Sequence, residues 1–452
     1  MAKSKSNFIC QKCGASYSKW VGKCENCGEW NSLVEQVIDE SEAVAKSAIA
    51  KGQISGKSLS ISSIRDITPS DSKARLLTEF QDLNEVLGGG ILMGSVSLLT
   101  GQPGIGKSTL LMQICAEISK TKKVLYISGE ESAGQVKLRA KRLGAESDQL
   151  FFASSTSGND IAKTIESGEF SLVIVDSIQT LSLAEISSAP GTVSQVNNCG
   201  NLIIRAAKAT DTAVIIVGHV TKEGTLAGPK VLEHLVDVVL NFEGDRYGGF
   251  KTVRAVKNRF GSTSEVAIFE MNDKGLSEVK NPSAALLAER QNTDGSIILA
   301  TLEGSRPILV EIQALVTKSN FGYPKRTASG FDLNRLNLLI AVIERRTKLF
   351  LNDKDIFVNV VGGMRLQDSA ADLAVCMAIA SAAAGRKLSE DYVVFGEVGL
   401  GGEIRSAFRP DQRIAEAKKL GFTHALAPKT IKDKFVIPAN DLRETLIKYV
   451  NN

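Results

Sequence analysis

Residues 101–108, with the sequence GQPGIGKS, have the types and spacing needed to hold a polyphosphate. They match the G-x-x-x-x-G-K-[ST] pattern between an apolar strand and an apolar-faced helix, which is the context that this pattern requires. Glycines let backbone N–H groups approach a phosphate closely, and the helix N-terminus adds partial positive charge. Lys107 is expected to reach the β and γ phosphates and Ser108 to bind Mg²⁺, so the predicted cofactors are ATP and Mg²⁺. The predicted nucleotide-binding residues are Gly101, Gln102, Pro103, Gly104, Ile105, Gly106, Lys107, Ser108 and Thr109.

Four cysteines near the N-terminus form two Cys-x-x-Cys pairs, Cys10 with Cys13 and Cys24 with Cys27. A two-residue gap lets both thiolates of a pair bind one ion from a tight turn. No histidine or carboxylate belongs to the pattern, so we expect a structural Zn²⁺ site whose metal supplies the folding energy of a very small module. A redox dithiol pair or an iron–sulfur site is the alternative.

Aromatic and basic side chains surround these cysteines, namely Tyr17, Lys19, Trp20, Lys23 and Trp30. Aromatic rings beside lysines can stack on single-stranded bases. The same rings can equally form the small core of the module. The sequence leaves both interpretations open.

Length and composition bound the classes of protein that need to be considered. The chain has 452 residues, 43% of them hydrophobic, which favours two to four folded units. The formal charge is only +4, so any contact with DNA must come from local basic surface. There is no apolar run of about 18 residues and no signal peptide after Met1, and we expect a cytoplasmic protein without membrane contact. The seven cysteines are an odd number, which fits a reducing compartment.

The nucleotide loop lies in a segment that alternates apolar strands with helices. A short helix is predicted at residues 80–87, and strands at residues 96–100, 124–128, 172–177 and 213–218. Continuous apolar strands separated by helices indicate an α/β fold with a parallel sheet covered on both faces. Ligands of such a sheet bind at the carboxyl ends of its strands.

Polar residues follow these strands at the edge where a ligand is expected. Asp176 is a candidate Mg²⁺ ligand, although a strand-end aspartate can also cap the next helix. Glu130 or Glu131 is a candidate for the base that orients and deprotonates the attacking water. Gln179 and His219 are placed to sense the γ-phosphate, and His219 is equally suited to a structural hydrogen bond.

Several segments stand out from the rest of the sequence: LGGG at residues 87–90, YISGEES at 126–132, LVIVDSIQT at 172–180, GHVTKEG at 218–224, LAGPKVLEHLVDVVL at 226–240 and KNRFG at 257–261. Together they resemble the RadA (Sms) family of bacterial DNA-recombination and repair ATPases, which is related to RecA and to replicative DnaB helicases. The resemblance spans essentially the whole chain. By position, it favours Glu130 over Glu131 as the catalytic base. It implies a RecA-like P-loop ATPase core, an N-terminal four-cysteine zinc finger and a C-terminal α+β domain similar to Lon protease.

The same resemblance implies a function. We expect a DNA-dependent ATP hydrolase of the helicase type that forms a hexameric ring, translocates on single-stranded DNA and promotes branch migration in recombination and DNA repair. Its implied partners are single-stranded DNA, branched recombination intermediates and the RecA recombinase. The alternative is a zinc-containing, KaiC-like regulatory ATPase that acts on a protein partner and not on DNA.

The KNRFG segment carries two cations, Lys257 and Arg259, which lie two residues apart and therefore point to the same side of an extended chain. In a ring of subunits, such a pair can stabilise charge on the γ-phosphate bound by a neighbour. A basic hairpin facing solvent is the alternative. By similarity to RecA-type rings, residues 221–230 are expected to line a central channel, with Lys222 and Lys230 on DNA phosphates.

The expected domains are a zinc finger at residues 1–31, a linker at 32–75 that leaves the finger mobile and holds one strand at 58–64, an ATPase domain at 76–280 and the Lon-like domain at 285–452. In the last domain, strands are predicted at residues 296–302, 307–316, 356–361, 392–397 and 403–406, and helices at 333–349, 370–384 and 409–420.

A working Lon site needs a serine nucleophile and a lysine base. The positions that match this pair hold Ala370 and Asp411, and the neighbouring Ser369 has no lysine at the matching place. No peptidase activity is therefore expected. The domain is expected to build the hexamer and to offer a basic face, or simply a solvated charged one, with Arg335, Arg345, Arg346 and Lys348.

Overall fold

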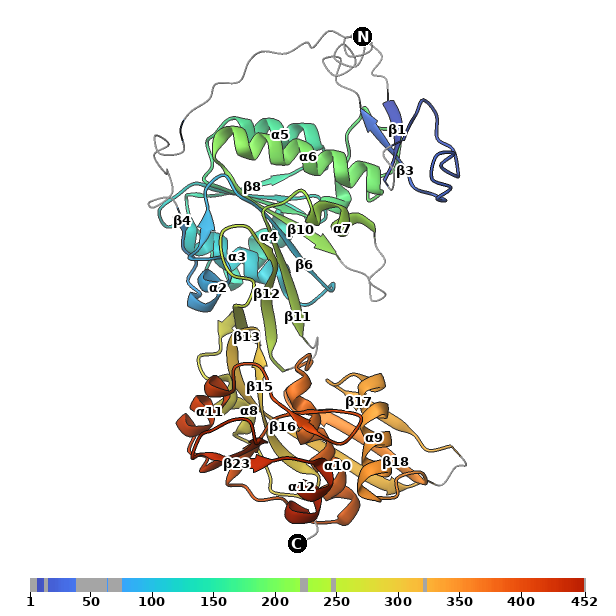
Figure 1. The fold of residues 1–452 in the computed structure, drawn as a ribbon. Helices are drawn as coiled ribbons and strands as arrows, with labels where there is room; N and C mark the ends of the chain where they lie inside the picture. Colours follow the sequence, from blue (N-terminus) through green and yellow to red (C-terminus); the bar gives the residue numbers. More distant parts are fainter. Residues whose placement is uncertain are drawn as a thin grey trace. The chain divides into compact units, whose positions relative to one another are not determined.

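The structure, a computed structural model, describes residues 6–11, 15–37, 63, 75–219, 227–244, 249–319 and 323–450 (Figure 1). The chain divides into two compact units. The first comprises Met1–Glu243, Val253–Thr263 and Asp273–Leu276, and the second comprises Gly244–Thr252, Ser264–Asn272 and Ser277–Asn452.

The N-terminal ribbon is a small antiparallel sheet with the strand order β2-β1-β3. Its strands are β1 (Ser6–Cys10), β2 (Ser16–Tyr17) and β3 (Leu33–Val37). The ribbon extends past the expected boundary at residue 31, because β3 pairs with β1 along its whole length. Of the strand expected at residues 58–64, only Ser63 lies within the described residues.

A nine-stranded sheet forms the centre of the ATPase fold, in the order β14-β13-β12-β11-β6-β10-β9-β7-β8. The six strands from β11 to β8 are parallel to one another. Every residue of β6, β7 and β9 is buried, which explains their uninterrupted apolar sequences. The strands are β6 (Val96–Gly101), β7 (Val124–Ser128), β8 (Leu150–Ser154), β9 (Leu172–Asp176), β10 (Ala213–His219), β11 (Val238–Gly244), β12 (Lys251–Asn258), β13 (Val266–Asn272) and β14 (Gly275–Glu278).

Helices cover both faces of this sheet. Figure 1 shows α5 and α6 on one face and α3 on the opposite face. Apolar residues of α5 and α6, such as Ile161 and Ile203, join residues of the strands in one buried cluster. The helices are α2 (Gln81–Val86), α3 (Lys107–Ile118), α4 (Ala133–Arg142), α5 (Gly158–Glu166), α6 (Val193–Thr210) and α7 (Ala227–Glu233), with a 3₁₀ turn at Ile178–Thr180 and a two-stranded sheet of β4 (Arg75–Leu76) and β5 (Ile91–Leu92).

The C-terminal α+β fold contains a seven-stranded sheet in the order β17-β18-β16-β15-β19-β22-β23 and a two-stranded sheet of β20 and β21. The strands are β15 (Ser296–Glu303), β16 (Arg306–Lys318), β17 (Arg326–Ser329), β18 (Lys354–Val360), β19 (Tyr392–Val394), β20 (Glu397–Val398), β21 (Ile404–Arg405), β22 (His424–Pro428) and β23 (Val436–Ala439). The helices are α8 (Pro282–Leu287), α9 (Leu333–Thr347), α10 (Asp372–Ala384), α11 (Pro410–Lys419) and α12 (Leu442–Tyr449).

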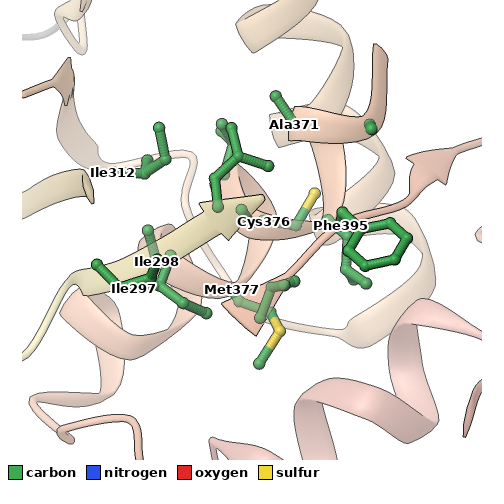
Figure 2. Close-up of a cluster of buried hydrophobic side chains, with 14 of the residues drawn as sticks. Ile297, Ile298, Ile312, Ala371, Cys376, Met377 and Phe395 are labelled. Carbon is green, nitrogen blue, oxygen red and sulfur yellow. The ribbon is translucent and has the colours of Figure 1, made fainter. Parts of the chain in front are cut away.

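Helix α10 lies at the centre of this fold, and its residues 372–381 are all buried. Figure 2 shows Cys376 and Met377 of α10 among Ile298, Ile312 and Phe395 from the surrounding elements. Small alanine side chains let the neighbouring elements approach the helix closely. The expected helix at 370–384 begins as a 3₁₀ turn, Ser369–Ala371, and becomes α-helical at Asp372.

Among the helices of the described residues, none combines the length and apolarity that crossing a lipid bilayer requires.

Candidate nucleotide and metal sites

The loop between β6 and α3 has the backbone of a phosphate cradle. Gly104 and Gly106 have φ angles of +79° and +118°, in the left-handed region where a side chain is strained. A Cβ atom at Gly101 would lie 2.5 Å from the carbonyl oxygen of Phe242, whereas one at Gly104 would meet nothing within 4 Å. Ile105 is buried and anchors the loop. The backbone of Phe242 and the burial of Ile105 thus fix the position of the loop, while the space beside Gly104 stays free for a phosphate.

Lys107, the first residue of α3, points into this loop. Its side chain is almost fully buried, and its ammonium donates hydrogen bonds to the carbonyls of Gly101 (2.8 Å) and Gln102 (3.1 Å). Burial lowers the pKa of Lys107 to about 8, although the carboxylates of Asp176 and Glu130 oppose that shift. The cation is therefore placed inside the loop by backbone oxygens.

Asp176 lies at the end of β9, beside the loop, as expected. Its Oδ2 atom accepts hydrogen bonds from the Ser108 hydroxyl (2.9 Å) and the Tyr126 hydroxyl (2.5 Å). An adjacent hydroxyl and carboxylate are the oxygen ligands that Mg²⁺ takes in nucleotide sites, so the residues fit this metal. Sequence reasoning missed Tyr126, because a tyrosine inside the apolar strand β7 is indistinguishable from a core residue.

The two glutamates after β7 have different surroundings. Glu131 forms an ion pair with Arg139 of α4, the helix that follows the two glutamates in sequence. Glu130 instead accepts a hydrogen bond from the Ser177 hydroxyl (2.5 Å), and its Oε1 atom lies 3.4 Å from Nε2 of His219. Only Glu130 therefore faces the carboxyl ends of β9 and β10.

Gln179 and His219 also meet at this edge. The Gln179 amide donates to the carbonyl of His219 (3.4 Å). Within the described residues, the buried Oε1 atom of Gln179 and both ring nitrogens of His219 have no hydrogen-bond partner. Buried polar atoms without partners are costly, and they are suited to a bound polar ligand.

Lys257, on β12, is bound within its own subunit. Its ammonium donates to the carbonyls of Glu233 (2.8 Å), the last residue of α7, and of His234 (3.2 Å) and Val236 (2.8 Å) in the turn that follows. Burial, and next the charge of Arg259, lower the pKa of Lys257. A cation at this end of a helix satisfies carbonyls that have no partner within the helix.

Arg259 has a looser setting. Its Nη1 atom lies 3.2 Å from Oδ1 of the buried Asp237, yet 55% of the side chain is exposed. The other oxygen of Asp237 is bound by Lys208 (2.6 Å) and by the backbone N–H of Val96 (3.0 Å). Asp237 is therefore fixed, whereas the guanidinium of Arg259 stays accessible.

The candidate DNA-binding segment is only partly covered by the described residues. Lys222 lies outside them, and Lys230 is exposed on α7. The segment predicted as a channel loop at 221–230 is helical from Ala227.

In the ribbon, the sulfur atoms of Cys10, Cys24 and Cys27 lie within 4.8 Å of one another. The sulfurs of Cys10 and Cys27 are 3.6 Å apart, close to the separation of about 3.8 Å expected for thiolates bound tetrahedrally to zinc at about 2.3 Å. The Tyr17 hydroxyl shares a hydrogen bond with the Cys24 sulfur (3.3 Å), and this bond lowers the pKa of the Cys24 thiol. Cys13 lies outside the described residues.

The positions that match the Lon nucleophile and base hold groups without that chemistry. Ala370 is buried, and Asp411 lies in the first turn of α11. The Ser369 hydroxyl donates to the carboxylate of Glu397 (3.1 Å). Two residues after Asp411 in α11, the fully buried Arg413 forms an ion pair with Asp368 (2.6 Å).

The expected basic face on α9 needs one correction. Arg335 forms an ion pair with the buried Asp372, and its guanidinium also donates to the carbonyl of Val398 (3.1 Å). This arginine therefore ties α9 to α10 and does not extend toward solvent with the other cations of the helix.

Three family models match parts of the chain. An AAA domain model matches residues 65–225, a rubredoxin metal binding domain model matches residues 8–35, and the model of subunit ChlI of Mg-chelatase matches residues 338–431. Together with the loop and the cysteine cluster, these matches confirm ATP, Mg²⁺ and Zn²⁺ as the cofactors. They also confirm the predicted fold class, a RecA-like α/β ATPase core with an N-terminal zinc ribbon and a C-terminal α+β domain.

Among solved structures, the chain is similar to the RadB recombinase, with 21% identity and a TM-score of 0.36 over 45% of this chain and 100% of that one. It is also similar to the flagellar accessory protein FlaH from Methanocaldococcus jannaschii, with 18% identity and a TM-score of 0.37 over 46% of this chain and 98% of that one.

Curated relatives match over nearly the full length. The DNA repair protein RadA of Bacillus subtilis is 48% identical over 97% of this chain and 95% of its own. The proteins of the same name from Halalkalibacterium halodurans and Aquifex aeolicus are 47% and 44% identical, covering 97% and 99% of this chain and 96% and 99% of their own. With such identities over almost its entire length, the chain belongs to the RadA family of DNA repair proteins.

Proposed function

We propose that this protein is a DNA-stimulated ATPase that assembles into a hexameric ring, translocates on single-stranded DNA and promotes branch migration of recombination intermediates. The chain belongs to a family of DNA repair proteins, and this membership supports the proposal of an ATPase that acts in repair and recombination. The observation that carries the proposal is the grouping of Lys107, Ser108, Asp176 and Glu130 at one edge of the parallel sheet.

Each of these side chains has a definite part in hydrolysis. With nucleotide bound, Lys107 would exchange its loop carbonyls for the β and γ phosphates, and Ser108 and Asp176 would hold Mg²⁺, which would supply positive charge beside the phosphate oxygens. Glu130 orients the attacking water and accepts its proton. The Oε1 atom of Gln179 and the ring nitrogens of His219, which lack hydrogen-bond partners among the described residues, complete the contacts to the bound nucleotide and the attacking water.

The KNRFG segment acts across the boundary between subunits. Arg259 supplies a guanidinium to the γ-phosphate of a neighbour, because more than half of its side chain is exposed while Asp237 orients it. Lys257 supports this arrangement from within, since its three carbonyl partners fix β12 to the end of α7. Lys222 and Lys230 bind DNA phosphates, and the RecA recombinase and branched DNA are the partners suggested by the family resemblance.

The test measures ATP turnover with and without single-stranded DNA, alongside the mass of the protein in solution. The wild-type protein should show stimulation by DNA and the mass of a ring. Lys107→Ala should lose about 100-fold or more of the turnover, the scale on which loss of one preorganised charge contact slows an enzyme. Lys120→Ala, which removes an exposed lysine just beyond the end of the same helix, is the matched control.

Two results would overturn the proposal. Undiminished turnover in Lys107→Ala would refute the nucleotide site. Turnover that is indifferent to DNA, together with no extension of heteroduplex on a three-strand branched substrate, would refute the DNA motor and leave an ATPase of another kind.

A further inference from the structure

The two tryptophans of the ribbon are not part of its core. The buried cluster of the ribbon consists of Cys10, Cys24 and Leu33, with Tyr17 and Val21 among the residues packed against it. Trp20 and Trp30 are 55% and 68% exposed. Two exposed indoles close together on so small a module form an apolar patch of the kind that marks an interaction site.

Both indoles converge on one point of the ribbon surface. A Cβ atom built on Gly22 would lie 3.7 Å from the Trp20 ring and 3.9 Å from the Trp30 ring. Residues 22–23 are joined to residues 30–31 by a bridge between Lys23 and Trp30 and by a hydrogen bond from the N–H of Asn31 to the carbonyl of Gly22 (2.8 Å). An edge of each ring thus borders Gly22, and the backbone contacts hold together the two segments that carry the rings.

Cations accompany both rings. The ammonium of Lys23 lies 5.6 Å from the centroid of the Trp30 ring, and Lys19, next to Trp20, is exposed. Single-stranded DNA is chemically complementary to this surface. Its unpaired bases can stack on the indoles, and its phosphates attract the ammonium groups. A purely apolar peptide would match the rings but would carry no negative charge to complement the two ammonium groups.

We propose that Trp20 and Trp30 form a binding site for single-stranded DNA, on which unpaired bases stack while Lys19 and Lys23 contact the adjoining phosphates. The choice of ligand rests on the proposed function, and the site consists of residues other than those of the ATPase edge and other than Lys222 and Lys230. Because stacking does not discriminate strongly among bases, the site suits a protein that must accept any sequence.

The sequence makes a direct test available, since Trp20 and Trp30 are the two tryptophans of the whole chain. Tryptophan emission of the zinc-loaded, full-length protein therefore reports on this surface. Titration with an oligothymidylate should quench that emission along the same curve as the anisotropy of a fluorophore on the oligonucleotide. The Trp20→Phe and Trp30→Phe variants, each with one tryptophan left, should show which ring is quenched.

Affinity measurements on matched variants separate stacking from simple burial. Trp20→Ala and Trp30→Ala should each weaken binding about 5- to 150-fold, which corresponds to the ~1–3 kcal/mol of one stacked base. The phenylalanine variants should recover most of that loss. Lys23→Gln should lower the salt dependence of log K by about 0.7 if it contacts one phosphate. Phe350→Ala, which removes an 81% exposed aromatic ring of the C-terminal fold, should change nothing.

The inference would be overturned if the oligonucleotide bound without changing the tryptophan emission of the wild-type protein and if both alanine variants bound it with wild-type affinity. That result would assign the rings to a protein partner. Absence of any DNA binding would overturn it as well. Quenching without stimulation of ATP turnover would uphold the site while refuting the proposed motor, so the two proposals fail separately.

Discussion

At the scale of single residues, Lys107 provides a pH signature for the nucleotide site. Its pKa of about 8 in the nucleotide-free protein lies below the ordinary 10.5, because the ammonium is buried. An anionic polyphosphate favours the charged form and raises this pKa again. Binding should therefore take up protons at and above pH 8, and nucleotide affinity should fall as pH rises toward 10.

Calorimetry of ADP binding in two buffers of different ionisation enthalpy measures this uptake. Lys107→Met should bind weakly and take up no proton. Because the folded pKa is the lower one, the unfolded chain binds more protons between pH 8 and 10.5, and the free energy of unfolding of the nucleotide-free protein should rise with pH across that window. Proton uptake that persists in Lys107→Met would assign the effect to another group.

Tyr126 gives a second prediction at this scale. Its hydroxyl donates to Asp176, so Tyr126→Phe should leave the carboxylate less well oriented toward the metal. The loss of a hydrogen bond to a charged group, about 1.5 kcal/mol or more, should raise the Mg²⁺ concentration for half-maximal nucleotide binding roughly tenfold. Fluorescent-nucleotide titrations at several Mg²⁺ concentrations measure it. Tyr392→Phe, another buried tyrosine, is the control, and equal Mg²⁺ requirements in both variants would refute the role.

Single residues also show how far sequence reasoning reaches. The phosphate loop and the cysteine pairs are found by spacing, because their function fixes the distance between residues along the chain. The partners of the site, Tyr126 and Arg139, are brought to it by tertiary packing. Nothing in their local sequence separates Tyr126 from a core residue or Arg139 from an exposed helical cation, although the structure pairs Arg139 with Glu131.

At the scale of elements, buried strands could be predicted almost to the residue. Strand β7 matches its predicted range, and β9 and β10 each differ by one residue at the carboxyl end, because apolar runs stop where polar residues begin. Strands such as β17, with the sequence RTAS, carry no apolar period and form only because β18 lies alongside. Strand β3 falls in the segment predicted as a linker for a similar reason, since it forms a strand only by pairing with β1, on the other side of the cysteine pairs in sequence.

The contact between two glycine segments yields a stability prediction. A Cβ atom at Gly261, the last residue of KNRFG, would lie 2.7 Å from the Cα atom of Gly88. Gly261→Ala should therefore lower the free energy of unfolding by about 1–3 kcal/mol, as expected for overpacking. Chemical denaturation measures this change. The control is Gly134→Ala in α4, where a Cβ atom meets nothing within 4 Å, and similar effects of both variants would contradict the packing argument.

At the scale of the whole molecule, the assignment of Arg259 to a neighbouring subunit predicts complementation. Lys107→Ala subunits lack a working nucleotide loop but keep the arginine, and Arg259→Ala subunits have the opposite defect. Mixed assemblies of the proposed ring would contain interfaces with both groups intact, so mixing should restore part of the DNA-stimulated turnover, with a maximum at intermediate ratios. Recovery at no ratio would place the action of Arg259 within its own chain.

The C-terminal domain shows the same division between what sequence can and cannot predict. The residues at the peptidase positions, Ala370 and Asp411, are evident from alignment with the Lon motifs. The pairing of Arg413 with Asp368 is not, because the two residues lie far apart in sequence and meet only when α11 packs beside the turn before α10. Burial of such a charged pair needs a partner for each charge, and only the folded domain provides it.

The attachment of Lys257 to the end of α7 has a mechanical consequence. Three hydrogen bonds join the ammonium to the last carbonyl of the helix and to two carbonyls of the turn that follows it, and Arg259 comes two residues later on the same short segment. A force on Lys230 that rotated α7 would therefore also displace Arg259, because Lys257 connects the end of α7 to the segment that carries this arginine. A pulling force from bound DNA would then be coupled mechanically to the cleavage of the γ-phosphate bond in the neighbouring subunit.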